Sequence, residues 1–392
     1  MTTHDFDQLI ERRGTHSAKW DKMESFCGVS PDDGIPMWVA DMDFRPPQAV
    51  IDSVKTYADH GVFGYFGDDD AYLNAITWWM ENRHGWIVDP SHIFSTHGLV
   101  NGTGLCLQAF SEPGDGIVMF TPIYHAFFRV IHAANRQVVE CPMVLDGATY
   151  SLDIAAYDQM MTGREKMLIL CSPHNPGGRV WSREELTEIL NFAKRHDLII
   201  VSDEIHHDLV MPDKKHIPFA LIEGARDRLV MMSACTKTFN LAGMHTGNVI
   251  IADPELRQRF ETTMASLGIS PNAFAKHMVT AAYSPNGAQW VDELMAYIDG
   301  NRRLFDEAIN AIPGLKSMPL EGTYLAWVDF SDTGMTVDEI KKRILEDAKI
   351  AVNQGETFGA GGADFQRFNL ATPRSRVKEA VERMQSAFGD LQ

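Results

Sequence analysis

Short apolar segments alternate with longer amphipathic ones from residue 93 to residue 251, and this alternation constrains the fold more than any other feature of the chain. Apolar segments of this length are typical of buried strands, whereas the segments between them have the spacing of helices. Strands that are joined through helices pair in parallel. The sequence therefore predicts an α/β protein with a large, doubly wound and mostly parallel sheet. We expect strands at residues 93–95, 117–120, 138–141, 167–171, 198–202, 229–232 and 248–251, and helices that include 99–110 and 183–196, the latter behind a capping box of Ser182 and Glu185.

A second, smaller α/β pattern follows a long helical stretch around residues 290–312. Its strands are expected at 323–328, 350–353 and 368–370, and its helices at 336–347 and from Ser375 onward. The segment before the first pattern is polar up to about Gly34 and then apolar. We therefore predict an N-terminal arm (1–45) that completes a small C-terminal domain (286–392), with a large domain between them (46–285).

Composition excludes several classes of partner. The formal charge of −18 repels nucleic acid and anionic lipid, so neither is expected to bind. The first thirty residues lack the apolar core of a signal peptide, and no apolar stretch approaches the ~20 residues that span a bilayer. The five cysteines are scattered and form no C-x-x-C pair. We expect free thiols and a cytoplasmic protein.

Four segments with reactive or polar side chains lie where apolar strands end. In a doubly wound sheet, ligands bind beyond the carboxyl ends of the strands. We therefore expect the four segments to form one site. They are residues 96–99 (Thr-His-Gly-Leu), 171–178 (Cys-Ser-Pro-His-Asn-Pro-Gly-Gly), 202–206 (Ser-Asp-Glu-Ile-His) and 233–240 (Ser-Ala-Cys-Thr-Lys-Thr-Phe-Asn).

Lys237 and Asp203 indicate the chemistry of this site. Most lysines are solvated, but a desolvated amine at a strand end has a lowered pKa and can form a Schiff base with a carbonyl cofactor. A buried carboxylate such as Asp203 can keep a pyridine nitrogen protonated, which makes the ring an electron sink. The pair therefore predicts a pyridoxal phosphate site in which both residues are catalytic.

The same acidic segment, residues 203–207, also suggests a metal site as an alternative. Its adjacent histidines, His206 and His207, point in different directions, and no HExxH or carboxylate-triad spacing accompanies them. We expect no metal.

Phosphate and ring contacts are expected from neighbouring segments. Gly98, Leu99 and Val100 open a helix directly after a strand, where free N–H groups and the positive helix end bind phosphate, and Thr236 can add a hydroxyl. As a bare pattern this glycine-rich run is also compatible with helix packing.

Three further side chains complete the predicted site. Tyr124 is either an interior aromatic or a ring that stacks on a planar cofactor. Asn175 is either part of a turn or a donor to the cofactor's phenolic oxygen. Arg367, expected just before a strand of the small domain, has the fork geometry that clamps an amino-acid carboxylate.

With these residues the chain resembles fold-type I pyridoxal phosphate enzymes of the aminotransferase class I and II superfamily over nearly its whole length. More narrowly, it resembles the MalY/PatB subfamily of cystathionine β-lyase-like carbon–sulfur lyases. The motifs that carry the narrower resemblance are Arg-Gly-Thr-His-Ser-Ala-Lys-Trp-Asp (13–21), Met-Trp-Val-Ala-Asp-Met-Asp-Phe (37–44), Cys-Ser-Pro-His-Asn-Pro (171–176), Ser-Asp-Glu-Ile-His (202–206) and Lys-Thr-Phe-Asn-Leu-Ala-Gly (237–243).

The resemblance implies a β-lyase that cleaves the C–S bond of L-cystathionine or a related cysteine S-conjugate to pyruvate, ammonia and a thiol, with Tyr124 assisting proton transfer. It implies His206 as a cofactor contact, and Ala40 and Asn175 beside Arg367 as substrate contacts. It also implies a homodimer with shared active sites, in which Tyr65 reaches the neighbouring subunit's phosphate.

Two departures from the family pattern bear on the activity. Cys235-Thr236 replaces the usual Pro-Ser before the lysine, and His245 stands where aminotransferases of this fold generally have a phosphate-binding arginine. The second departure favours a lyase over the alternative, an aminotransferase. A regulatory binding protein with the same fold is a further alternative, and a nicotinamide dehydrogenase is disfavoured because no GxGxxG follows the first strand.

Overall fold

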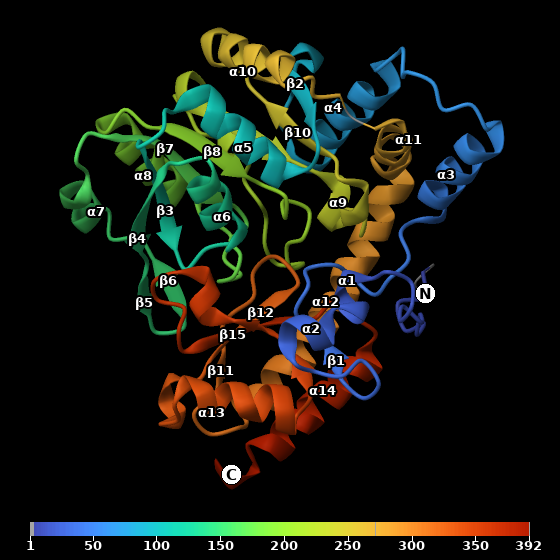
Figure 1. The fold of residues 1–392 in the computed structure, drawn as a ribbon, viewed down its shortest axis with the longest axis vertical. Coiled ribbons are helices and arrows are strands. Elements are labelled where there is room, and N and C mark those ends of the chain that lie inside the picture. The colour runs from blue at the N-terminus through green and yellow to red at the C-terminus, as the bar shows by residue number, and fades with distance from the viewer. Residues whose placement is uncertain (1–3, 271, 392) are drawn as a thin grey trace.

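The computed structural model describes residues 4–270 and 272–391 and contains one large sheet of seven strands in the order β2-β10-β9-β8-β7-β3-β4 (Figure 1). All neighbouring strands from β9 to β4 pair in parallel, whereas β10 runs antiparallel to both β9 and β2. The predicted mostly parallel sheet is confirmed. Its strands are β2 (Ile93–Thr96), β3 (Gly116–Thr121), β4 (Gln137–Pro142), β7 (Glu165–Cys171), β8 (Ile199–Asp203), β9 (Leu229–Ser233) and β10 (Gly247–Ile250).

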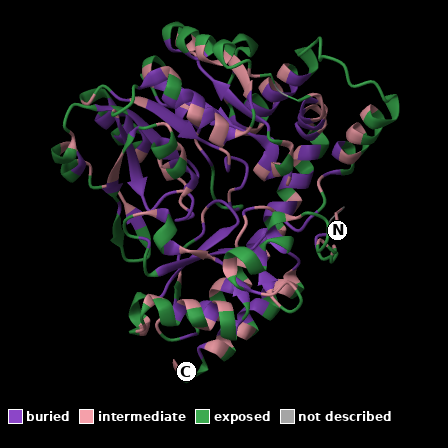
Figure 2. Ribbon diagram, in the orientation of Figure 1, coloured by how far each residue is buried: buried purple, intermediate pink, exposed green. Residues whose placement is uncertain are grey.

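The central strands are apolar throughout because helices cover both faces of this sheet. Ile117 and Met119 of β3 belong to one apolar cluster with α5, α6 and α10, whereas Val118 and Phe120 belong to another with α4 and α8. Figure 2 shows the resulting buried band across the sheet with exposed residues on the outer helices. The covering helices are α3 (Gln48–His60), α4 (Asp70–His84), α5 (Leu99–Phe110), α6 (Ala126–Ala133), α7 (Ile154–Met160), α8 (Arg183–Arg195), α10 (Pro254–Ser266) and α11 (Ala273–Ala282).

A second sheet of four strands, in the order β11-β12-β15-β14, lies below the large one in Figure 1. The N-terminal segment joins this region, because β1 (Ile35–Pro36) pairs in parallel with β13 (Ile350–Ala351). The remaining elements are α1 (Ala18–Asp21), α2 (Met23–Cys27), β5 (Val144–Asp146), β6 (Thr149–Ser151), α9 (Cys235–Thr238), α12 (Pro285–Asn310), β11 (Lys316–Ser317), β12 (Leu325–Asp329), α13 (Val337–Lys342), β14 (Asn353–Gln354), β15 (Phe365–Asn369) and α14 (Arg374–Ala387).

Local signals located most elements well. The capping box of Ser182 and Glu185 is present at the start of α8. The expected helix at 336–347 begins as α13 and continues as a π-helical turn over Arg343–Asp347.

Three expectations for residues 286–392 need correction. The single strand expected at 350–353 is two short strands, β13 and β14, which belong to different sheets. The strand expected at 323–328 begins later, because Thr323 has a φ of 71° and cannot continue a strand. Arg367 does not precede its strand but lies in the middle of β15, opposite Trp327 of β12 and Asn353 of β14.

The described residues contain no helix that combines the length and apolarity needed to cross a membrane. All five cysteines are unpaired, and only Cys27 is not fully buried.

Candidate active site

A cavity of about 500 Å³ lies at the carboxyl ends of the parallel strands, as the topology predicts. The four polar segments meet there, together with residues from the N-terminal part of the chain. Of the predicted site residues, the cavity is lined by Ala40, Gly98, Leu99, Val100, Tyr124, Asn175, Asp203, His206, Thr236 and Lys237.

Lys237 lies on the short helix α9, directly after β9. Its Nζ donates a hydrogen bond to the carbonyl oxygen of Ala40 at 2.6 Å. Burial lowers the pKa of Lys237 to about 8, although the nearby Asp41 carboxylate opposes this effect. About a tenth of the amine is therefore neutral at pH 7, far more than for a solvated lysine, and the neutral amine is the form that attacks a carbonyl.

Asp203 is the last residue of β8, and its carboxylate accepts a hydrogen bond from the backbone N–H of Ile205 at 3.1 Å. Burial raises the pKa of Asp203 to about 7. A buried carboxylate whose negative charge is balanced by so few hydrogen bonds favours a cation beside it. A protonated ring nitrogen would supply that charge.

The two adjacent histidines diverge, as the sequence predicts. His206 lines the cavity, and its Nδ1 is buried without a hydrogen-bond partner. Burial, supported by the Lys237 and Arg367 charges, holds the pKa of His206 well below its usual range, so the ring is neutral. His207 turns away and bonds the carbonyl of Glu204 through Nδ1.

The N-terminus of α5 is open to the cavity. Its N-cap residue, Gly98, has φ 85° and ψ 166°, a conformation that is essentially restricted to glycine, and no side chain caps the helix. A Cβ at Gly98 would meet no other atom within 4 Å. The free N–H groups of this helix end and the lining residue Thr236 therefore form a cradle that suits a phosphate.

Tyr124 and Asn175 line the cavity, whereas Arg367 lies behind them and is not a lining residue. Arg367 is fully buried, and its Nη1 donates to Asn175 Oδ1 at 2.9 Å. Its other contacts are the carbonyl of Trp38 at 3.0 Å and the Asn353 side chain, and its Nε has no partner. Burial lowers the pKa of Arg367 to about 10. Within residues 4–270 and 272–391 this cation bonds only neutral acceptors, so an anion is the missing partner.

Tyr65 lies far from this arrangement in the single chain. Its side chain is fully exposed on the irregular segment between α3 and α4, and it lines a shallow hollow with Phe66 and His277 rather than the cavity.

Several residues that line the cavity were given no individual role from the sequence. His97 and Ile205 stand in the predicted segments 96–99 and 202–206, and Ala242 in the motif 237–243, whereas Asn101, Arg129 and Thr246 lie outside them. Their proximity to predicted residues along the chain is the one signal that could have found them.

Asp208 was also missed, although it stands in the same Asp-Glu-Ile-His-His-Asp run as Asp203. It is buried behind the cavity and joins α4 to Thr238, the residue after Lys237. Its carboxylate accepts from or pairs with Trp79 Nε1 (2.9 Å), His84 Nε2 (2.8 Å), Thr238 Oγ1 (2.8 Å) and His207 Nε2 (3.1 Å). His84, His207 and Asp208 lie close enough to share a cation, but the carboxylate is already surrounded by these donors.

The donor set as a whole fits pyridoxal phosphate. It combines Lys237, which is partly neutral, with the buried carboxylate of Asp203, which has no cation bonded to it among the described residues. The helix end at Gly98 is open, the oxygen of the Asn175 amide is already bonded to Arg367, and the cavity has a suitable volume. Such a set holds an aldehyde, a pyridine nitrogen, a phosphate and a phenolic oxygen.

Comparisons with known proteins agree with this fit. Residues 32–384 match the family model of aminotransferase class I and II. The chain is 38% identical over 386 residues to the cystathionine β-lyase PatB of Bacillus subtilis (strain 168), covering 97% of this chain and 99% of that protein. It is 30% identical to the protein MalY of Escherichia coli (strain K12), covering 96% and 97%. The crystal structure of cystalysin from Treponema denticola, which contains a pyridoxal 5'-phosphate cofactor, superposes with a TM-score of 0.94 at 35% identity, covering 99% and 100%.

Proposed function

Since the chain belongs to the aminotransferase class I and II family, in its MalY/PatB branch, we propose that it is a pyridoxal phosphate-dependent carbon–sulfur β-lyase. Its substrate is L-cystathionine or a related cysteine S-conjugate, and its products are pyruvate, ammonia and a thiol. The relatives named as cystathionine β-lyases support the lyase over an aminotransferase. So does His245, which stands where the family's aminotransferases generally have an arginine.

Residues of the cavity would hold the cofactor. The α5 N-terminus, with Thr236, binds its phosphate; Asp203 binds its ring nitrogen; Asn175 donates to its phenolic oxygen; and Tyr124 and His206 pack against its ring. When bound, pyridoxal phosphate supplies an aldehyde that takes up the substrate's amino group and a ring that withdraws electrons from Cα.

The chain's own side chains then handle the substrate's charges and protons. Arg367 binds the α-carboxylate, because its buried guanidinium bonds only neutral acceptors within the described residues. The neutral amine of Lys237 removes the proton from Cα. The electron pair left on Cα forms a double bond to Cβ as the Cβ–S bond breaks.

Tyr124 is the candidate acid for the departing sulfur. Burial raises the pKa of Tyr124, which keeps its hydroxyl protonated and able to donate. The thiol leaves with that proton, and the unsaturated amine that remains takes up water to give pyruvate and ammonia.

The observation that carries this proposal is the meeting of Lys237, with a pKa of about 8, and Asp203, with a pKa of about 7, in one cavity with an open helix end. The test is pyruvate release from cystathionine, cystine and S-alkyl cysteines by the holoenzyme without any added keto acid. Borohydride reduction should also leave the cofactor attached to Lys237. Obligatory dependence on a keto acid would favour the aminotransferase instead.

We extend the proposal to the whole molecule. The chain acts as a homodimer in the cytoplasm, with Tyr65 contributed to the partner's phosphate site. It is divided into an arm (1–45), a large domain (46–285) and a small domain (286–392). The exposure of Tyr65 and of Phe63 beside it supports an interface there, and the free cysteines support the compartment.

A further inference from the structure

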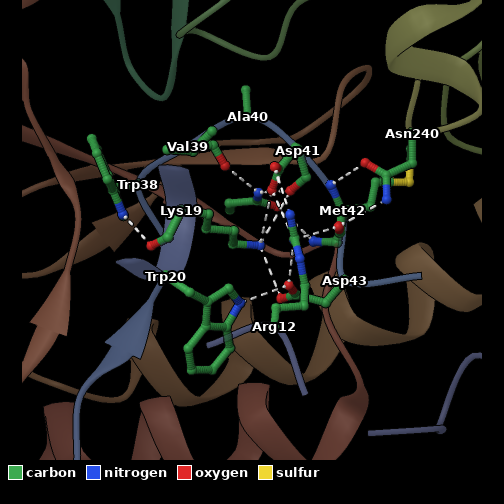
Figure 3. Close-up of polar contacts among 12 residues, drawn as sticks. Arg12, Lys19, Trp20, Trp38, Val39, Ala40, Asp41, Met42, Asp43 and Asn240 are labelled. Carbon is green, nitrogen blue, oxygen red and sulfur yellow. Dashed lines mark hydrogen bonds and ion pairs between the residues drawn. The ribbon is translucent and has the colours of Figure 1, made fainter. Parts of the chain in front are cut away.

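Two N-terminal segments, whose charged side chains have no role in the proposed chemistry, meet each other (Figure 3). One is the arm that carries Arg12 and Lys19. The other is residues 37–44, which we term the strap. It contacts the reactive lysine through the carbonyl of Ala40. The strap follows β1 and forms no strand of its own.

The backbone of the strap is bonded to neighbouring backbone at Met37 and Asp43, and side chains bond its other carbonyl groups. The carbonyl of Ala40 accepts from Lys237 at 2.6 Å and from the hydroxyl of Tyr324 at 2.9 Å, and the carbonyl of Trp38 accepts from Arg367 at 3.0 Å. The strap therefore contacts both the reactive lysine and the proposed carboxylate clamp. Further donors to its carbonyls are Asn369 (to Val39 and Asp41), Lys19 (to Asp41), Arg12 (to Met42) and Asn240 (to Met42 and Phe44).

A charge network ties the strap to the arm. Lys19 is fully buried and its Nζ lies 2.9 Å from Asp43 Oδ2, while Arg12 Nη1 lies 2.8 Å from Asp43 Oδ1. Burial alone would raise the pKa of Asp43, but Lys19 and Arg12 outweigh it and lower the pKa to about 2. Arg12 also donates two parallel hydrogen bonds to Asp41, from Nη1 to Oδ1 at 3.1 Å and from Nη2 to Oδ2 at 2.9 Å.

The pair of Arg12 and Asp41 stands at the approach to the active site. Both side chains are about 20% exposed and line a hollow of about 700 Å³. This hollow shares Ala40 and Lys237 with the cofactor cavity. Lys19 Nζ also lies 3.9 Å from Asp41 Oδ1. Without Arg12, the Asp41 carboxylate would lose its two close bonds and keep this longer contact, which leaves more of its negative charge uncompensated at a site that binds an anionic substrate group.

We propose that the ion pair of Arg12 and Asp41 is a positioning device for substrate binding. It holds the strap against Lys237 and cancels a negative charge at the approach to the site. Lys19 and Asp43 anchor the pair from the buried side. The inference rests on the proposed function, in which Arg367 binds the substrate's α-carboxylate.

The test measures the Kd of the holoenzyme for L-alanine from the change in visible absorbance. L-alanine carries the α-carboxylate and amine but no leaving group, so its binding is independent of C–S cleavage. Arg12→Gln should raise this Kd on the order of tenfold, because like charges are brought together. The double variant Arg12→Gln/Asp41→Asn removes both charges and should return the Kd to within about threefold of the wild type.

Arg13→Gln is the matched control, because Arg13 is the next residue and, among the residues that the structure describes, pairs only with the exposed Glu11. Its Kd should change by less than about twofold. An Arg12→Gln Kd equal to that of Arg13→Gln overturns the proposal, and so does a double variant as weak as the single one. If Arg12→Gln does not fold, Arg12→Lys takes its place, since a point charge lacks the two parallel bonds; an unchanged Kd then overturns the proposal.

Pyruvate release by the wild type is measured in parallel. Its absence would contradict the lyase activity and leave the L-alanine comparison intact.

Discussion

Burial acts in opposite directions on the two ionisable residues of the catalytic pair. It lowers the pKa of the Lys237 amine and raises that of the Asp203 carboxylate, so each tends toward its neutral form in the cavity. A bound pyridine cation would restore the charge of Asp203. The two residues therefore favour binding of a ligand that carries a positively charged nitrogen.

The burial of Asp203 lowers the stability of the apoenzyme at neutral pH, and this effect can be measured. Asp203 has a folded pKa of about 7 and an unfolded value of 3.8, so the folded state binds more protons between these pH values. Its contribution to the free energy of unfolding is present below about pH 4 and is lost as pH rises through 7, by up to about 4 kcal/mol. The side chain of Asp203→Asn does not titrate. The free energy of unfolding of the variant, measured with urea, should therefore rise relative to that of the wild type between pH 5 and pH 8.

The exposed Asp197, which lies just before β8, offers a control. Asp197→Asn should differ from the wild type equally at both pH values. In the holoenzyme, Asp203→Asn should lower kcat on the order of 10²–10³-fold through loss of electrostatic stabilisation. Parallel pH profiles of stability for Asp203→Asn and wild type would contradict the burial of a charge at this position.

Arg367 should govern recognition of the α-carboxylate. Truncating one partner of a desolvated charge pair costs about 2–5 kcal/mol, so Arg367→Ala should lower kcat/KM by roughly 30- to several-thousand-fold. Arg367→Lys should recover only part of this, because a point charge cannot form two parallel bonds.

The measurement compares an amino acid with its carboxamide. The wild type should prefer the acid strongly, and Arg367→Ala should not. A variant that keeps the full preference would assign the carboxylate to another group. Cofactor absorbance is the internal control and should be nearly unchanged.

At the scale of the element, the proposed phosphate site at the start of α5 should govern cofactor retention. Gly98 has a conformation that costs other residues about 1–3 kcal/mol, and it opens the helix end toward the cavity. Gly98→Ala should therefore raise the Kd for pyridoxal phosphate by roughly tenfold or more, measured by absorbance titration of the apoenzyme.

Gly104 lies on the same helix and tests whether the effect is local. Its added Cβ would meet only Val130 at 3.7 Å, an ordinary contact. Gly104→Ala should leave the Kd unchanged and raise helix stability by up to about 1 kcal/mol. Equal effects of the two substitutions on the Kd would remove the phosphate role from this helix end.

At the scale of the whole molecule, the proposed homodimer predicts complementation between inactive subunits. Lys237→Ala should lack both turnover and the visible absorbance of a lysine-linked cofactor. Tyr65→Ala should lose cofactor affinity and turnover, because the proposed dimer places Tyr65 at the partner's phosphate site. A hybrid of the two subunits contains one site with both residues intact, so mixing them through mild unfolding and refolding should restore turnover.

Mixtures that stay as inactive as their parents would contradict shared sites. Refolding each variant alone is the control, since it separates complementation from recovery of damaged protein. Sedimentation equilibrium of the wild type checks the dimer independently.

Local signals in the sequence were sufficient for the large sheet and for most of the site. The strands before Asp203 and Lys237 were recognisable because strands buried on both faces are apolar without interruption, and their carboxyl ends share one edge. The same rule brought Gly98, Asn175 and Tyr124 to one cavity. The capping box of α8 is equally local.

The tertiary structure alone decided the contacts between distant segments. Arg367 meets Asn175 and Trp38 across separations of 192 and 329 residues, and Arg12 meets Asp41 across 29. Strands β13 and β14 separate into two sheets although they are nearly adjacent in the chain. The sequence by itself determined which segments form strands and helices and which strand ends carry reactive groups, because periodicity and capping act over a few residues. Packing determined the partner of each buried charge. That choice depends on which distant segments exclude water from the charge, and the periodicity of one segment does not indicate which other segment it meets.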